Sequence, residues 1–184
     1  MVRDVSTPAA PAARPTAERM VPWTTGAFAA GEIVALSAVL LAMGLRNPRL
    51  LLQDYPGDVR AAVPPKTAAE RRETVWWNLP FLCLLFGTPL AAAVVARLQL
   101  PALSFPGAFT NAFIVMIAFD LFDWLVIDWL VFCTLTPRFV VLPGTEGMAG
   151  YKDHAMHFRG FLVGLGLALA ASAAIAGLTL LLPA

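Results

Sequence analysis

Residues 107–136 read GAFTNAFIVMIAFDLFDWLVIDWLVFCTLT. This stretch is long and apolar enough to cross a bilayer, yet it carries Asp120, Asp123 and Asp128 near its middle. A charged Asp at the centre of a bilayer costs about 2.5–3.5 kcal/mol on insertion scales. Three carboxylates in one such segment therefore require a structural or a functional reason.

The composition of the whole chain is typical of a membrane protein. Of its 184 residues, 59% are hydrophobic and only 14% are charged, whereas a soluble domain is typically about 25% charged. The mean hydropathy is +0.72. The net charge is +1 and no basic cluster is present, so the sequence gives no indication of nucleic-acid binding.

Long apolar stretches predict an all-α integral membrane protein, folded as a four-helix bundle. The expected spans are residues 23–45, 75–97, 107–136 and 157–182. At about 1.5 Å per residue, the first of these covers roughly 34 Å, enough to cross the hydrocarbon core. Residues 1–22 are predicted to form a flexible tail before a transmembrane domain that covers 23–184.

The basic residues predict how these spans are oriented. Nine Lys and Arg residues fall in the first and third connections or beside them: Arg46, Arg49, Arg60, Lys66, Arg71, Arg72, Arg138, Lys152 and Arg159. The opposite side has four: Arg3, Arg14, Arg19 and Arg97. By the positive-inside rule, the two long connections are cytoplasmic and both termini lie on the non-cytoplasmic side.

Two local patterns predict structure near the membrane surface. Thr67-Ala68-Ala69-Glu70 fits a capping box, so the second helix is expected to begin near Ala68, outside the membrane. In the fourth span, small residues recur at four-residue intervals, which predicts close approach to another helix. They are Gly160, Gly164, Ala168, Ser172 and Ala176.

The polar residues of the third and fourth spans predict a shared centre near the cytoplasmic side. In an α-helix the three Asp residues fit within an arc of about 140°, so one broad face could hold them away from lipid. His154 and His157 share a face if the fourth helix begins early enough. The residues expected beside this centre are Asn78 on the second span and Glu146 and Tyr151 on the third connection.

Three functions agree with this pattern. In the first, the acids pair with Arg138, Lys152, Arg159, Asn78 or tyrosine hydroxyls and hold the helices together. The protein would then be a non-enzymatic accessory or assembly subunit of a membrane complex, or a homo-oligomer.

The second function is a membrane enzyme that acts on a lipid-like substrate. Its candidate catalytic residues are Asp123, Asp128, His154 and His157, which could carry general acid–base chemistry. Alternatively, Asp128, His154 and His157 would hold a divalent metal, Zn or Fe, since imidazole and carboxylate suit both ions. His-x-x-His without HExxH is a weak metal signal.

The third function is a proton or ion relay. Glu32 in the first span would join Asp120 and Asp123 as relay positions, because ionisable residues inside a membrane mark such paths.

Four segments resemble sequences of small uncharacterised bacterial multi-pass membrane proteins: Gln53-Asp54-Tyr55-Pro56, Val63-Pro64-Pro65-Lys66-Thr67, Phe122-Asp123-Trp124-Leu125-Val126-Ile127-Asp128-Trp129 and Pro143-Gly144-Thr145-Glu146-Gly147-Met148. The last continues into Tyr151-Lys152-Asp153 and His157-Phe158. The resemblance implies a multi-pass protein of a bacterial inner (plasma) membrane, with the lipid bilayer as its surroundings. It implies no activity and no catalytic residue.

Overall fold

The computed structural model describes residues 16–182, with side chains from Pro22 onward. Every regular element in this part of the chain is helical. The elements are α1 (Thr16–Arg46), η1 (Pro48–Asp54), α2 (Gly57–Ala62), α3 (Ala68–Gln99), α4 (Phe105–Phe122), η2 (Asp123–Leu135), η3 (Arg138–Val140), η4 (Ala149–Lys152) and α5 (His154–Leu181). The all-α prediction is confirmed for the described residues.

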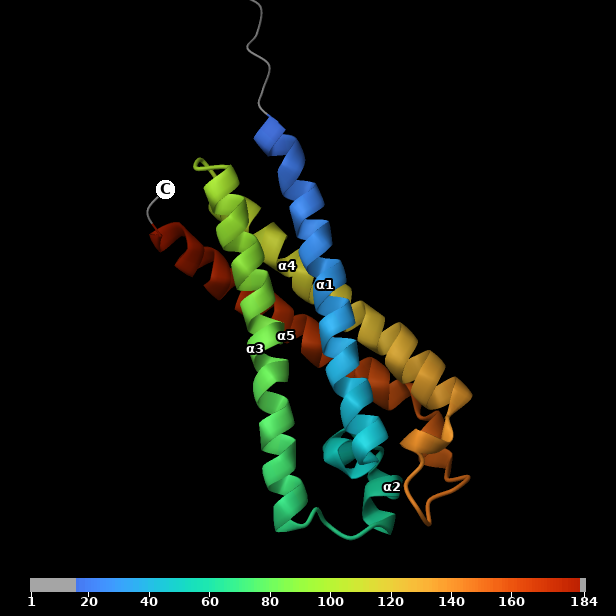
Figure 1. Cartoon of the computed structure of the whole chain (residues 1–184). Helices are drawn as coiled ribbons and strands as arrows, with labels where there is room; N and C mark the ends of the chain where they lie inside the picture. Colours follow the sequence, from blue (N-terminus) through green and yellow to red (C-terminus); the bar gives the residue numbers. More distant parts are fainter. Residues whose placement is uncertain (1–15, 183–184) are drawn as a thin grey trace, which may run out of the picture.

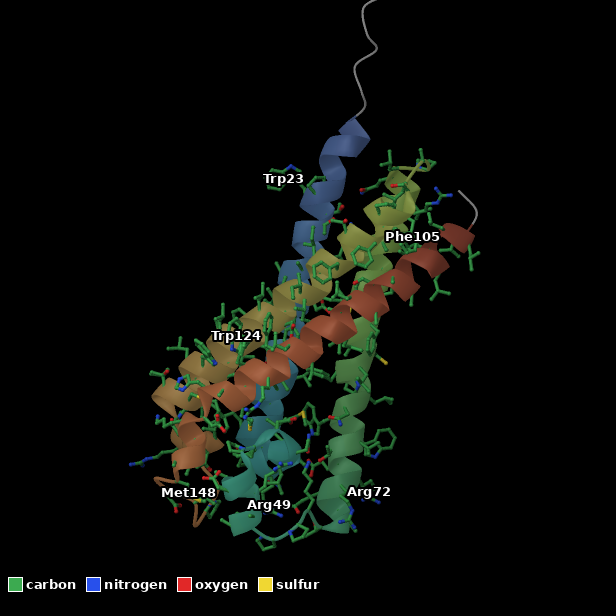
Figure 2. All side chains as sticks on the ribbon, turned by 180° about the vertical axis from the view of Figure 1, so that it is seen from behind. Trp23, Arg49, Arg72, Phe105, Trp124 and Met148 are labelled. Atoms are coloured by element: carbon green, nitrogen blue, oxygen red, sulfur yellow. The ribbon has the colours of Figure 1, made fainter. Side chains whose placement is uncertain are left out.

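The long helices run back and forth and pack against one another. Contacts join α4 with α5, α1 with α3, α3 with α4, α1 with α4 and α3 with α5. Figure 1 shows the start of α1 and the end of α5 at one end of the molecule, while α2 lies at the other end. Figure 2 shows Arg49, Arg72 and Met148 at this second end, far from Trp23 and Phe105.

Three helices are long and apolar enough to cross a membrane. They contain the stretches Pro22–Arg46, Ala68–Gln99 and His154–Leu181, with hydropathies of 2.0, 2.1 and 2.2. Large apolar side chains such as Val34 and Val163 are 69% and 75% exposed. Such a surface is compatible with a lipid bilayer and costly in water.

Small buried residues allow the helices to approach closely. Ala93 on α3, Ala112 on α4 and Ala168 on α5 share one apolar cluster. Within the predicted ridge of α5, Ala168, Ser172 and Ala176 are buried, as close packing requires, whereas Gly160 is exposed. The ridge therefore begins one turn later than its spacing indicates.

The boundaries of two helices follow local chemistry. Helix α3 begins at Ala68, and Thr67 and Glu70 form the predicted capping box. The helix then continues through Pro80 and Pro89 without a break. Helix α1 begins at Thr16, within the predicted tail; the rest of that tail, residues 1–15, lies outside the described residues.

The third predicted span is not one regular α-helix. The α-helix α4 ends at Phe122, and η2 continues it as a π-helix, in which hydrogen bonds run from residue i to i−5. At its end, the backbone N–H of Thr136 donates to the carbonyl oxygen of Val131 over 2.8 Å. Thr136 itself has a left-handed conformation (φ 43°), which stops the helix.

The Asp residues were placed on one face by assuming an α-helix, but η2 is a π-helix with a wider turn, so its side chains are arranged differently. In an α-helix, residues five apart point about 140° away from each other. In a π-helix they lie much closer to a common face, because the turn holds more residues. Trp124 and Trp129 show this directly, with ring centroids 4.9 Å apart. Asp123 and Asp128 have the same separation in sequence.

The connections at the second end fold into a compact unit, here called the cap, which comprises residues 47–67 and 136–153. Its core is a cluster of buried side chains: Leu52, Tyr55, Val59, Leu142 and Tyr151. The Tyr55 hydroxyl donates to the carbonyl oxygen of Val140 over 2.7 Å. The Gly150 N–H donates to the Asp58 carboxylate over 2.9 Å. These contacts fix the position of η1 over the ends of η2 and α5.

Candidate functional site

The centre of the site is an ion pair between two helices. Asp128 lies on η2 and His157 on the first turn of α5, and Asp128 Oδ2 is 3.0 Å from His157 Nδ1. The His157 side chain is only 6% exposed and that of Asp128 is 25% exposed. A carboxylate on Nδ1 fixes the orientation of an imidazole ring and thereby the direction in which its other nitrogen points.

The other ring nitrogen of His157 has no partner. Its Nε2 atom is buried and forms no hydrogen bond with any described residue. One side of the ring packs against Phe132, with centroids 5.0 Å apart. Since a buried polar atom without a partner is unfavourable, Nε2 is a position where a proton, a water molecule or a substrate atom would be stabilised.

Three further carboxylates surround this pair. Asp123 interacts electrostatically with Asp128, Asp120 and Asp54, and Asp120 interacts with Asp128. Here we call Asp54, Asp120, Asp123, Asp128 and His157 the acidic centre. The π-helical turn explains why Asp123 and Asp128 act together, since it places residues five apart on one face.

Asp54 belongs to this centre although it lies 74 residues before Asp128 in the chain. It ends η1, which the cap holds beside η2 and α5. Asp54 is exposed as a whole residue, yet desolvation of its carboxyl raises the pKa from 3.8 to about 6; Lys66 opposes this rise, the Asp128 carboxylate adds to it, and Gln53 and His157 lower it. Asp54 thus lies on the surface of the cap within electrostatic range of the buried pair.

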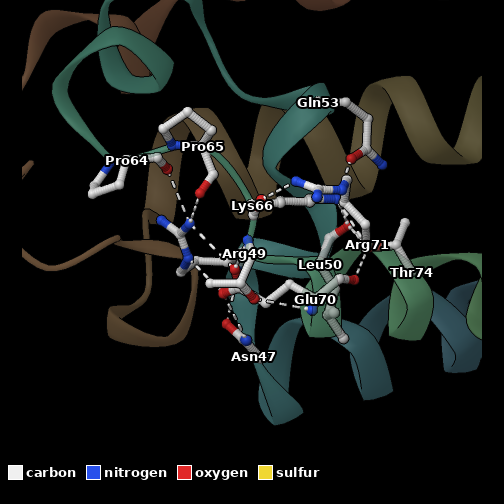
Figure 3. A network of polar contacts seen from close by, with 11 residues as sticks. Asn47, Arg49, Leu50, Gln53, Pro64, Pro65, Lys66, Glu70, Arg71 and Thr74 are labelled. Carbon is white, nitrogen blue, oxygen red and sulfur yellow. Dashed lines mark hydrogen bonds and ion pairs between the residues drawn. The ribbon is translucent and has the colours of Figure 1, made fainter.

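A polar network continues from Asp54 across the cap (Figure 3). The Gln53 side chain donates to Asp54 Oδ2 over 3.1 Å. Lys66 Nζ in turn donates to Gln53 Oε1, a bond that Figure 3 shows. Lys66 also donates to Leu50 O and Thr74 Oγ1. Burial lowers the pKa of Lys66, and the nearby Asp54 carboxylate opposes this shift.

Arg49 holds the other half of the same network. Its Nε atom lies 2.6 Å from Glu70 Oε1, and its Nη2 atom donates to the carbonyl oxygens of Pro64 and Pro65. The bond from Arg49, followed by the backbone N–H of Thr67, lowers the pKa of Glu70 from 4.5 to about 2. The network therefore fixes the loop before α3 and, through Lys66, the position of Gln53.

His154 does not join His157 at the ion pair. Its ring packs edge-on against Trp129 at 5.4 Å, and its Nδ1 atom lies 2.9 Å from the carbonyl oxygen of Lys152. Within residues 16–182, no three His, Cys, Asp or Glu side chains are grouped so that they could hold a metal ion. The arrangement does not bring Asp128, His154 and His157 together as a metal triad.

The cations proposed as partners of the acids have other contacts. Lys152 donates to the carbonyl oxygens of Cys133 and Thr134 and to Thr136 Oγ1, where η2 ends. Arg138 and Arg159 are exposed, and in the described part of the chain neither forms an ion pair with the acidic centre. His157 is the basic group that pairs with Asp128.

The other residues expected beside the centre, Tyr151, Glu146 and Asn78, form no hydrogen bond with it in the described part of the chain. The Tyr151 hydroxyl accepts a bond from the Leu142 N–H (2.9 Å) and lies 2.7 Å from Thr145 Oγ1, so it stabilises the loop. Glu146 accepts from the Gly144 N–H on the outside of that loop. Asn78 forms no hydrogen bond with the acidic centre as far as the chain is described.

Two carboxylates on the long helices α1 and α4 are buried without full hydrogen bonding. Glu32 on α1 is completely buried, and neither of its oxygens has a hydrogen-bond partner among residues 16–182. Asp120 Oδ2 is also unpartnered, and the carboxylate lies directly against Gly164 of α5. A buried carboxylate oxygen without a hydrogen-bond partner is costly.

The acidic centre therefore contains groups that can exchange protons, arranged from the cap inward. Four of its five residues were among the polar residues named from the sequence, and Asp54 was not. The only signal for Asp54 is its place in the segment Gln53-Asp54-Tyr55-Pro56, on which the resemblance partly rests. Comparisons with protein-family models, with curated proteins and with solved structures found no match for this chain.

Proposed function

We propose that the protein is a four-span protein of a bacterial inner membrane that transfers protons between the cytoplasm and the membrane interior. Besides the spans in α1, α3 and α5, the continuous helical run of α4 and η2, residues 105–135, is the third span in chain order. The concentration of Lys and Arg on the cap side supports a cytoplasmic cap, with both termini on the opposite side.

The observation that carries the proposal is the Asp128–His157 pair with a buried, unpartnered Nε2 atom. A histidine held by a carboxylate can accept a proton at one nitrogen while the other stays oriented. Its burial between two helices keeps this exchange away from bulk water. Such a group is suited to pass protons rather than only to join two helices.

The order of the acids supports a direction for the transfer. Asp54 is partly exposed on the cap, so it can exchange protons with the cytoplasm. Asp128 and His157 come next, and Asp123 and then Asp120 follow along the same helical run toward its middle. Asp54, Asp120 and Asp123 each interact electrostatically with Asp128. A proton bound to one of these carboxylates therefore changes the affinity of the others for protons.

The experiment is proton flux into vesicles that contain the purified protein and a pH-sensitive dye. With a potassium gradient and valinomycin as the driving force, the wild type should acidify the vesicle interior. Asp128→Asn and His157→Gln should each reduce the flux at least about tenfold, since one missing group interrupts proton transfer. Glu73→Gln is the matched control, because Glu73 pairs with Arg46 on the exposed surface. Absence of flux in the folded wild type contradicts transfer across the whole membrane, and absence of proton exchange at His157 as well contradicts the proposal.

The variant Glu32→Gln tests whether protons cross the whole membrane through Glu32. Glu32 is the buried acid of α1, away from the acidic centre. If protons cross the whole membrane through it, Glu32→Gln stops steady flux but leaves proton binding at His157 unchanged. Steady flux in this variant would show that Glu32 is outside the path.

A second candidate function is general base catalysis on a lipid-like substrate. The same unpartnered Nε2 favours it, since a base needs one nitrogen free while a carboxylate holds the other. Mass spectrometry of vesicle lipids after incubation with the wild type and His157→Gln distinguishes the two functions. A lipid product formed only by the wild type would favour the enzyme.

A further inference from the structure

A hollow of about 650 Å³ lies on the cap beside the end of η2, away from the acidic centre. Its lining includes Thr136, Arg138, Val141, Glu146, Met148 and Lys152. This volume falls within the range of sites for small organic ligands, roughly 300–1,000 Å³. Because Thr136 ends the membrane-spanning run, the hollow lies where headgroups of the inner leaflet would meet the cap.

The loop that forms the hollow is already fixed. Thr145 is completely buried, and its hydroxyl donates to the Leu142 carbonyl oxygen over 2.7 Å. The Tyr151 hydroxyl accepts from the Leu142 N–H on the inner side of the same loop. Gly144 and Gly147 take positive φ values of 84° and 78°, which only glycine adopts easily. A ligand would therefore meet a preformed site.

The charges of the hollow are of both signs. Arg138 is exposed and forms no ion pair with any residue that the structure describes, so its five N–H donors are available. The Lys152 ammonium adds a second positive charge but is held by three oxygens of η2 and its end. Glu146 is exposed, and the Gly144 N–H occupies Oε1. The second carboxylate oxygen can accept from a ligand.

The apolar surface beside the hollow continues into the membrane. Leu135 is 63% exposed and Leu130 is 46% exposed on η2. Acyl chains could lie along this face while a polar headgroup occupies the hollow. A soluble anion would gain nothing from that surface.

We propose that this hollow binds the headgroup of phosphatidylethanolamine from the inner leaflet. The Arg138 guanidinium binds the lipid phosphate, a group whose geometry it matches. The Glu146 carboxylate accepts hydrogen bonds from the ethanolamine ammonium, which a choline headgroup cannot donate. The proposal rests on the cap facing the inner leaflet and does not depend on proton transfer.

The test is native mass spectrometry of the detergent-purified protein, incubated separately with phosphatidylethanolamine, phosphatidylcholine and phosphatidylglycerol of identical acyl chains. The wild type should retain phosphatidylethanolamine about tenfold better than phosphatidylcholine, since one charge-assisted hydrogen bond is worth about that factor. Arg138→Gln should reduce retention of all three lipids. Glu146→Gln should reduce phosphatidylethanolamine to the level of phosphatidylcholine and leave phosphatidylglycerol unchanged or stronger.

Arg72→Gln is the matched control, because it removes one exposed positive charge near the start of α3 without touching the hollow. Equal retention of phosphatidylethanolamine and phosphatidylcholine by the wild type overturns the proposal, as does an unchanged lipid affinity in Arg138→Gln. Free phosphoethanolamine separates the two sources of this headgroup chemistry. If it displaces the lipid at equal concentration, the site is one for a soluble phosphate ester and the lipid proposal is wrong.

Discussion

The carboxylate of Asp120 on α4 occupies the space that a side chain at position 164 on α5 would need. Gly164 has no Cβ, and an added Cβ would overlap the Asp120 carboxylate. The close approach of the two helices and the position of one member of the acidic centre therefore depend on the same glycine. Packing and site geometry are linked at this point.

Gly164→Ala is expected to displace Asp120 and to lower the free energy of unfolding by about 1–3 kcal/mol, the usual cost of overpacking. Gly160→Ala is the control, because nothing lies within 4 Å of the added Cβ there. Thermal unfolding in detergent measures both. If the two variants unfold at the same temperature, Asp120 does not lie against α5 as described.

The link between α2 and η4 gives a second prediction. The Gly150 N–H donates to Asp58, and a Cβ on Gly150 would overlap that carboxylate. Gly150→Ala should therefore destabilise the cap by about 1–3 kcal/mol. It should also speed amide hydrogen exchange in residues 142–151. Gly57→Ala, where nothing lies within 4 Å, should leave exchange in that loop unchanged; equal effects would contradict the contact.

The capping box of α3 predicts a pH-dependent effect. Glu70 has a pKa lowered to about 2 by its bond from Arg49, against 4.5 for an ordinary Glu. Its contribution to stability is therefore complete above about pH 4.5 and disappears as the pH falls toward 2. Gln at position 70 can still form the capping box but loses the charge that pairs with Arg49, so Glu70→Gln should cost about 0.2–1 kcal/mol at pH 7. The difference from wild type should vanish near pH 2, and a difference that persists there would contradict the assignment.

Asp54 predicts the opposite dependence on pH. Burial raises its pKa from 3.8 to about 6, so between these values the folded protein holds a proton that the unfolded chain has released. Its contribution to stability is complete below about pH 4 and falls as the pH rises to 6. Asp54→Asn should remove this fall and should be at least as stable as the wild type at pH 7. Unfolding curves at pH 4, 5, 6 and 7 measure it, and parallel curves for both proteins would contradict it.

Features that depend on neighbouring residues could be predicted from the sequence. The capping box of Thr67 and Glu70 is such a case, because its hydrogen bonds join residues three apart. The close-packed face of α5 was also predicted from spacing alone, apart from Gly160. His157 was expected from the sequence to belong to a polar centre shared with the third span, and its side chain is buried beside Asp128.

Features that depend on distant residues could not be predicted. Asp54 belongs to the acidic centre only because Tyr55 and Tyr151, far apart in the chain, pack together in the cap. The alignment of Asp123 with Asp128 depends on the π-helical turn, which apolar periodicity does not reveal. His154 was expected beside His157, but Trp129 and the Lys152 carbonyl hold it elsewhere.

The central claim is that His157 exchanges protons with the cytoplasm through Asp54. Solid-state nitrogen NMR of the ¹⁵N-histidine-labelled protein in bilayers tests it directly, because the chain has only two histidines and His154→Gln assigns their signals. We predict that the His157 ring gains and loses a proton reversibly as the bath pH is changed, and that Asp54→Asn slows this exchange. A His157 signal that keeps one protonation state at every pH at which the protein stays folded would contradict the account.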